Sequence, residues 1–114
     1  MSALAELNTL LDGLKIKVET GIFKGKAPDT YTVLTPLADT DELFADNMPQ
    51  IEVQEVSISI FTKGSYTALR QKIVKALRKA DFTITDKHYI GYETDTAYHH
   101  YEVDVAKEYN VEEE

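Results

Sequence analysis

The segment 50–62 carries the alternating pattern that most limits how this chain can fold. Ile51 and Val53 share one parity, whereas Val56, Ile58 and Ile60 share the other. Because successive side chains of a strand point to opposite faces, the segment is expected to be a long strand with one face in the core. The change of parity at residues 54–55 predicts a β-bulge or a bend within that strand.

Apolar residues at helical spacing predict two helices. The first spans 3–13, with Ser2 as its N-cap and Gly13 at its end. The second spans about 65–80 and has an apolar stripe formed by Tyr66, Leu69, Ile73, Ala76, Leu77 and Ala80. The residues predicted to be buried in the core are Leu7, Leu11, Ile58, Ile60, Leu69, Ile73, Leu77 and Val103.

Runs of β-forming residues predict further strands around 16–18, 31–35, 82–85, 88–92 and 97–105, with a hairpin turn at 93–96. Pro36 is expected to close the strand at 31–35. The resulting order is α-β-β-β-α-β-β, which predicts an α+β fold with a mostly antiparallel sheet and two helices packed on one face. Residues 1–109 form a single domain in this interpretation, and residues 110–114 form a frayed acidic tail.

Composition limits the classes of protein to which the chain can belong. Its 114 residues suit one domain, and they include 12 basic and 20 acidic side chains but no cysteine. The missing cysteines exclude disulfides, a thiol nucleophile and thiolate zinc sites. The sequence has neither a membrane-length apolar run nor the pattern of a signal peptide at its start. We therefore expect a small, soluble, intracellular domain whose negative charge disfavours sequence-independent binding of nucleic acid.

Charge is separated along the chain. Residues 39–55 contain no basic side chain but six carboxylates, at Asp39, Asp41, Glu42, Asp46, Glu52 and Glu55. Residues 63–79 contain no acidic side chain but six cations, at Lys63, Arg70, Lys72, Lys75, Arg78 and Lys79. Like charges three or four residues apart destabilise an isolated helix by a few tenths of a kcal/mol per pair. An external anion would relieve that repulsion.

The cationic helix face has three possible interpretations. It can be a solvated surface, favoured at its C-terminal end by the helix dipole. It can contact DNA. It can also be an interface with the acidic segment of a second copy, in head-to-tail contacts that close into a ring. We predict the third of these, an interface whose contact residues are Arg70, Lys72, Lys75, Arg78 and Lys79.

The connection at 38–49 is long for two neighbouring strands, and loops of this length often have a function. It places Leu43, Phe44 and Met48 within an acidic stretch. These apolar residues either fold back onto the domain as an Ω-like loop or anchor a neighbouring protein, since aromatic and Met side chains are enriched at interfaces.

Patterns for catalysis or cofactor binding are missing from the sequence. His99 and His100 point to opposite faces of a regular strand, so they cannot hold one metal together, and His88 would add a single ligand. Aromatic packing beside neighbouring tyrosines is the expected role of these histidines. The acidic run from residue 39 lacks the Gly and Glu of a calcium loop, and no serine lies in a nucleophile motif. We predict a protein that is not an enzyme and that has no metal or cofactor.

Several segments together resemble the tail terminator, or tail completion, proteins of long-tailed bacteriophages and prophages of Gram-positive bacteria. The resemblance covers about residues 4–105. It is carried by the order of elements, the helix after Tyr66, and the segments LNTLL (7–11), YTVL (31–34), LFADN (43–47) and YHHYEV (98–103). The most specific of these pieces is FADN, at residues 44–47.

The resemblance implies a structural protein of the virion tail that is assembled in the host cytoplasm. Such proteins form a hexameric ring that caps the tail tube, ends its polymerisation and presents a surface to the head connector. DNA passes through the lumen without specific binding. The resemblance also implies that a loop facing the lumen or the tube holds Asp39, Asp41, Glu42, Phe44, Asp46 and Asn47. A carboxylate-lined lumen would repel DNA phosphates and let the genome slide.

Two other functions remain open at this point. The chain can be another head–tail connector or neck component. It can also be a small dimeric regulatory domain whose basic helix binds an anionic ligand. The mass in solution separates a ring from a dimer, because each subunit contributes 12.9 kDa.

Overall fold

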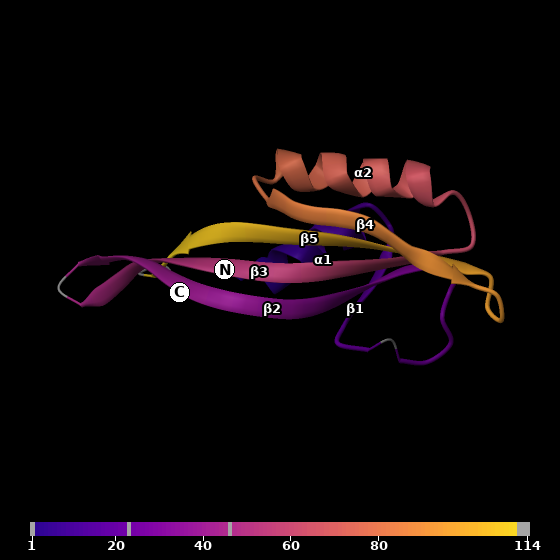
Figure 1. Ribbon diagram of the computed structural model, residues 1–114, viewed down its shortest axis with the longest axis horizontal. Coiled ribbons are helices and arrows are strands. Elements are labelled where there is room, and N and C mark those ends of the chain that lie inside the picture. Colours follow the sequence, from indigo (N-terminus) through magenta and orange to yellow (C-terminus); the bar gives the residue numbers. More distant parts are fainter. Residues whose placement is uncertain (1, 23, 46, 112–114) are drawn as a thin grey trace.

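A computed structural model describes residues 2–22, 24–45 and 47–111, which fold around one five-stranded sheet (Figure 1). The elements are α1 (Ala3–Gly13), β1 (Lys17–Thr20), β2 (Thr30–Ala45), β3 (Met48–Thr62), α2 (Tyr66–Lys79), β4 (Thr83–Glu93) and β5 (Tyr98–Asn110). The strand order is β1-β2-β3-β5-β4, and β1 pairs with β2 in parallel while the other pairs are antiparallel. The expected α+β fold and its order of elements are confirmed.

Both helices lie on the same face of the sheet and share one core with it. Each is capped by a serine hydroxyl: Ser2 accepts a hydrogen bond from the Ala5 N–H, and Ser65 accepts one from the Ala68 N–H. Of the residues predicted to form the core, Leu69 is partly buried and the others are fully buried. The face that the helices cover is called the helix side below, and the opposite face is called the open side.

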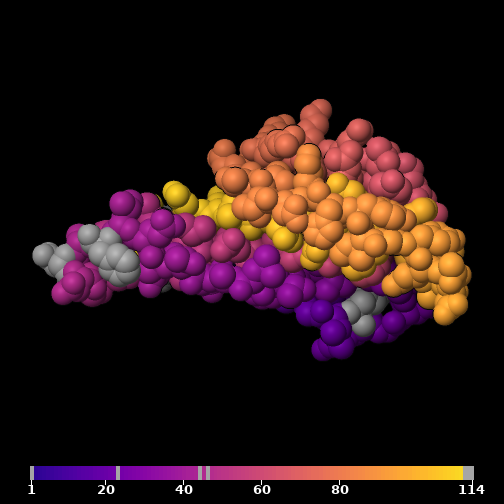
Figure 2. Space-filling view, viewed as in Figure 1, coloured from indigo at the N-terminus to yellow at the C-terminus, as the bar shows by residue number. Residues whose placement is uncertain are grey.

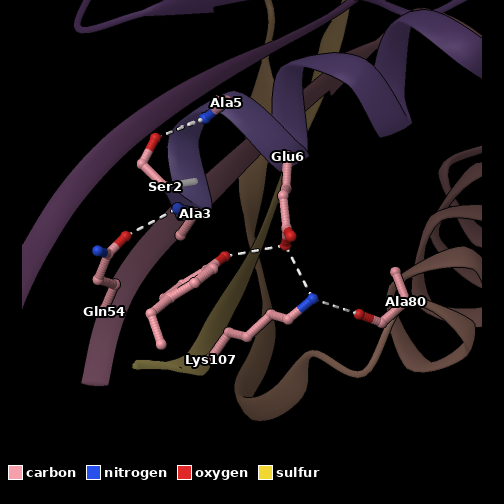
Figure 3. Close-up of polar contacts among 8 residues, drawn as sticks. Ser2, Ala3, Ala5, Glu6, Gln54, Ala80 and Lys107 are labelled. Carbon is pink, nitrogen blue, oxygen red and sulfur yellow. Dashed lines mark hydrogen bonds and ion pairs between the residues drawn. The ribbon is translucent and has the colours of Figure 1, made fainter. Parts of the chain in front are cut away.

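The N-terminal helix is fixed to the sheet by polar contacts as well as by its leucines (Figure 3). The side-chain carbonyl of Gln54, in β3, accepts a hydrogen bond from the Ala3 N–H at 2.7 Å. The Lys107 ammonium, in β5, lies 2.8 Å from the Glu6 carboxylate and donates to the Ala80 carbonyl at 2.9 Å. The first helix, the last strand and the end of α2 are thereby joined at one point.

The predicted bulge in the long strand is wrong in its location. β3 pairs with β5 without a register shift from Ile51 to Thr62. The irregularity lies in β2, between Pro36 and Ala38, where Leu37 is the extra residue. The parity of β3 does not need to change, because Gln54 occupies a helix-side position and satisfies the first N–H of α1.

Residues 38–45 and 48–49 of the stretch predicted to be a loop are instead paired strand. β2 does not end at Pro36 but continues to Ala45, and its last residues pair with Met48–Gln54 of β3. This two-stranded extension, residues 37–53, is called the arm. The arm reaches beyond the helices and gives the molecule its elongated shape of 55 × 26 × 23 Å (Figure 1; its narrow end is at the left of Figure 2).

The remaining differences concern the C-terminal half. The strands predicted at 82–85 and 88–92 form one strand, β4, with register shifts between Ile84 and Asp86 and between Tyr89 and Gly91. The predicted turn is present but lies one residue later, at 94–97, and β5 continues to Asn110, the first residue of the expected tail. Residues 112–114 of that tail lie outside the described residues. No helix in the described part of the chain is long and apolar enough to span a membrane.

Candidate functional site

The arm carries its carboxylates on both faces, and the pairing with β3 determines which face each one occupies. Asp39 is opposite Gln54, and Asp41 is opposite Glu52. Paired residues share a face of a sheet, and Gln54 contacts α1, so Asp39 and Asp41 lie on the helix side. Glu42 is opposite Ile51 and lies on the open side. Sequence reasoning placed these three residues together, and the structure divides them between two faces.

The end of the arm does not fold back onto the domain. Asn47 has φ 63°, a left-handed conformation that Asn tolerates in a tight hairpin turn, and Ala45 pairs with Met48 across that turn. Leu43 is 66% exposed and Met48 is 62% exposed. The Ω-like alternative is therefore wrong. Asp46 and the side chain of Phe44, which were predicted to belong to the same site, lie outside the described part.

The cationic face of α2 is largely as predicted. Lys72, Lys75, Arg78 and Lys79 are exposed, and none of the four forms an ion pair with another residue that the structure describes. Arg70 is half-buried, because its guanidinium lies 5.5 Å from the centre of the Tyr101 ring. The helix therefore presents four cations that the described part of the subunit leaves uncompensated.

A groove runs between α2 and β4, the outermost strand of the sheet. Its volume is about 300 Å³, and its lining residues are Arg70, Gln71, Val74, Lys75, Arg78 and Lys87. Sequence reasoning missed Lys87, which pairs with the buried Val103 and so lies on the helix side of β4. Lys72 and Lys79 are not part of the groove. The cationic face thus has two parts, a groove with Lys75 and Arg78 and an outer surface with Lys72 and Lys79.

The open side of the sheet, which no helix covers, is rich in carboxylates. The strand register assigns to this face Glu19, Glu42, Glu55, Asp86, Glu93, Glu102, Asp104 and Glu108. Among the described strand residues, Lys17 is the only lysine with a partner on this face. Sequence reasoning did not find this surface, because its residues come from five strands whose order only the fold determines.

A polar network crosses three strands of the open side. The His88 ring lies 2.8 Å from the Asp86 carboxylate through Nδ1 and 3.2 Å from the Glu102 carboxylate through Nε2. The Ser57 hydroxyl donates to the same Glu102 carboxylate. A serine nucleophile requires a base that takes its proton while a third group orients that base. Here the imidazole is bound to two carboxylates and the hydroxyl to one, so the arrangement is that of a structural network.

The other two histidines lie on opposite faces, as predicted. His99 is on the helix side, where its Nδ1 is 2.9 Å from the Tyr89 hydroxyl and its ring packs against Tyr66 and Tyr92. His100 is on the open side and stacks on Phe61 with ring centres 4.2 Å apart. Burial lowers the pKa of His100, against the opposing effect of nearby carboxylates. Among the described residues, no group of three His, Asp or Glu side chains is arranged to hold a metal ion.

Comparison with known proteins adds no family assignment: no family model matches the chain, and no curated protein matches it.

Proposed function

We propose that this protein is a non-enzymatic structural subunit that assembles with further copies into a ring and caps a bacteriophage tail tube. One observation carries the proposal: opposite charges have no ion-pair partner among the described residues and lie on separate surfaces. The arm holds Asp39 and Asp41 at one end of the molecule, and α2 holds Lys75 and Arg78 in its groove with β4. Lys72 and Lys79 lie on the outer surface of the same helix.

In a symmetric pair, two complementary patches can satisfy each other only where both copies of each patch meet in one interface. Patches on separate parts of the surface favour head-to-tail contacts, which close into a ring when the rotation between subunits allows it. The number of six subunits comes from the resemblance to tail terminators. Further copies, the tail-tube protein and the head connector protein are the proposed partners.

The open side of the sheet is the proposed wall of the lumen. It bears carboxylates such as Glu55, Glu102 and Asp104, whereas the helices with their cations lie on the other face. A lumen with this charge repels DNA phosphates and allows DNA to pass without being bound. In this arrangement the helices form the outside of the ring.

Sedimentation of the purified protein, followed by negative-stain imaging with purified tail tubes, tests this function. We expect a species of about six times 12.9 kDa, alone or on the tubes, and rings at one end of each tube. Tubes that remain uncapped, together with a monomeric or dimeric protein, would overturn the proposal. Rings that bind isolated head connectors but no tubes would support the neck component instead.

A second candidate function is supported by the groove between α2 and β4. Four cations, Arg70, Lys75, Arg78 and Lys87, line a space of about 300 Å³, which is large enough for a small anionic ligand. In this alternative the protein is a dimeric regulatory domain. A dimer in solution that binds inorganic phosphate or a nucleotide at micromolar concentration would favour it over the ring.

A further inference from the structure

Two edges of the sheet are open to pairing with another strand. β4 is the last strand on one side, and its 11 residues have β5 as their sheet neighbour. On the other side, β1 pairs with β2 only as far as Leu34. Within the described part of the chain, residues 35–45 of β2, which include one strand of the arm, therefore form a second free edge. Free edges of this kind can pair with a strand of another chain.

We propose that the arm of one copy lies along β4 of a second copy, so that Asp39 and Asp41 enter the cationic groove between α2 and β4. This inference rests on the proposed ring and specifies the contact between its subunits.

The direction of the strands permits this contact without reversing a subunit. β2 is antiparallel to β3, β3 to β5, and β5 to β4, so β2 and β4 run in opposite directions. A second copy displaced sideways in the plane of the sheet places its β4 antiparallel to the arm. The helix sides of the two copies then remain on the same face, and the open sides form one continuous surface.

The charges agree with the faces in this arrangement. Asp39 and Asp41 lie on the helix side of the arm, which is the side on which the neighbour's groove opens. The groove offers Lys75 and Arg78 from α2 and Lys87 from β4. Glu42, on the other face of the arm, joins the carboxylates of the open side instead. In this arrangement Asp39 and Asp41 bind the neighbouring subunit, whereas Glu42 belongs to the acidic open side.

The register shifts of β4 limit where the arm can pair. One lies between Ile84 and Asp86 and the other between Tyr89 and Gly91, so the regular stretch runs from Asp86 to Tyr89. Bulges restrain the pairing of an edge with unrelated strands. Lys87, the groove cation supplied by β4, lies within this regular stretch. Pairing and charge recognition therefore occur at the same place.

The first experiment uses two charge-reversed variants of the full chain. Lys75→Glu/Arg78→Glu reverses the groove, and Asp39→Lys/Asp41→Lys reverses the arm. Each variant alone places like charges in every contact, and we expect its subunit affinity to fall at least tenfold in sedimentation equilibrium, with an unchanged far-ultraviolet circular dichroism spectrum. An equimolar mixture should assemble again, because the normal arm of the groove variant then meets the normal groove of the arm variant, and the reversed arm meets the reversed groove.

Control variants reverse charges at other positions of the same two elements. Lys72→Glu/Lys79→Glu reverses two cations of the same helix outside the groove. Glu42→Lys reverses a carboxylate of the same arm on its other face. Both should assemble within about threefold of the original affinity. Assembly lost equally in the groove variant and in the outer-surface variant would overturn the groove as the docking site.

Hydrogen exchange of the assembled protein tests the strand pairing itself. We expect the amides of residues 86–89 and 37–45 to exchange at least tenfold more slowly in the ring than in the groove-reversed monomer. Unchanged exchange at both segments would overturn the pairing.

The outcomes also separate this inference from the proposed function. If the original protein caps tubes and both reversed variants do so too, the contact is wrong while the ring stands. If the original protein neither assembles nor caps tubes, both proposals fail. Binding of inorganic phosphate in the groove of a protein that remains monomeric at all concentrations would likewise overturn the contact with a second copy.

Discussion

The ammonium of Lys107 lies 2.8 Å from the carboxylate of Glu6, which places a residue of the last strand against the first helix. Both side chains are largely buried, with 21% and 23% of their surfaces exposed. The same ammonium donates to the Ala80 carbonyl just after α2, and the Tyr109 hydroxyl donates to Glu6 (Figure 3 shows the Lys107 contacts). Lys107 of β5 therefore connects α1 and the end of α2 to the last strand of the sheet.

Replacing Lys107 with Met should lower the free energy of unfolding by about 1–3 kcal/mol, because a partly buried carboxylate and a carbonyl lose a charged donor. Urea denaturation followed by circular dichroism measures the change. Lys63→Met is the matched control, since Lys63 and Asp29 are exposed and 3.8 Å apart. Its effect should stay within about 0.5 kcal/mol. Equal effects of the two substitutions would contradict the anchoring role of Lys107.

Truncation of Ile73 to Ala should destabilise the protein by ~2–5 kcal/mol, because this side chain is fully buried between α2 and the sheet. Lys72→Ala, one residue earlier on the exposed side of the same helix, should change the free energy of unfolding by less than about 0.5 kcal/mol. Thermal or chemical denaturation distinguishes the two. A small effect at Ile73 would mean that α2 does not pack through this face.

The stability of the protein should fall on acidification, in part because of His100. Burial lowers the pKa of His100 in the folded state, so the unfolded chain binds its proton at higher pH than the folded chain does. The stabilising contribution is complete above the unfolded pKa of about 6.5 and is lost as the pH falls through the folded value.

The variant His100→Phe keeps the ring stacked on Phe61 but removes the titrating group. We expect the midpoint of urea unfolding to depend less on pH between 7 and 5 in this variant than in the original protein. An unchanged slope would show that groups other than His100 account for the pH dependence.

Asp41→Lys should stabilise the isolated subunit by ~0.2–1 kcal/mol, because it replaces a pair of like charges opposite Glu52 with a pair of opposite charges. The measurement belongs at protein concentrations at which sedimentation shows a monomer, so that subunit contacts do not contribute. Glu42→Lys, opposite the apolar Ile51, should have a smaller effect on unfolding. A loss of stability in Asp41→Lys would contradict the register of the arm.

Local patterns in the sequence determined the helices and most of the strands. Helical spacing, with Ser2 as the predicted N-cap of α1, placed α1 at its observed bounds and α2 within one residue at each end. The segregation of charge into residues 39–55 and 63–79 was also visible without a structure. These features depend on the period of each element and on neighbours three or four residues away, so they can be recognised within a short segment.

Only the tertiary structure decided that residues 38–45 of the acidic segment form a strand. The sequence predicted a loop from Ala38 onward, because Pro36 and the polar residues after it are poor strand formers. The structure pairs this segment with β3, whose backbone supplies hydrogen-bond partners that residues 38–45 cannot supply themselves. At Leu37 a bulge places one extra residue in β2, and the pairing with β3 resumes at Ala38.

The groove and the open side were likewise fixed by long-range pairing. Lys87 reaches the cations of α2 because β4 is the outermost strand beside β5, an order that cannot be read from a local pattern. The division of Asp39 and Asp41 from Glu42 follows from their partners in β3, and the acidic open side follows from the register of five strands. Sequence thus determined which charges the protein carries, and strand pairing decided on which face each one lies, because a shift of one residue moves a side chain to the opposite face.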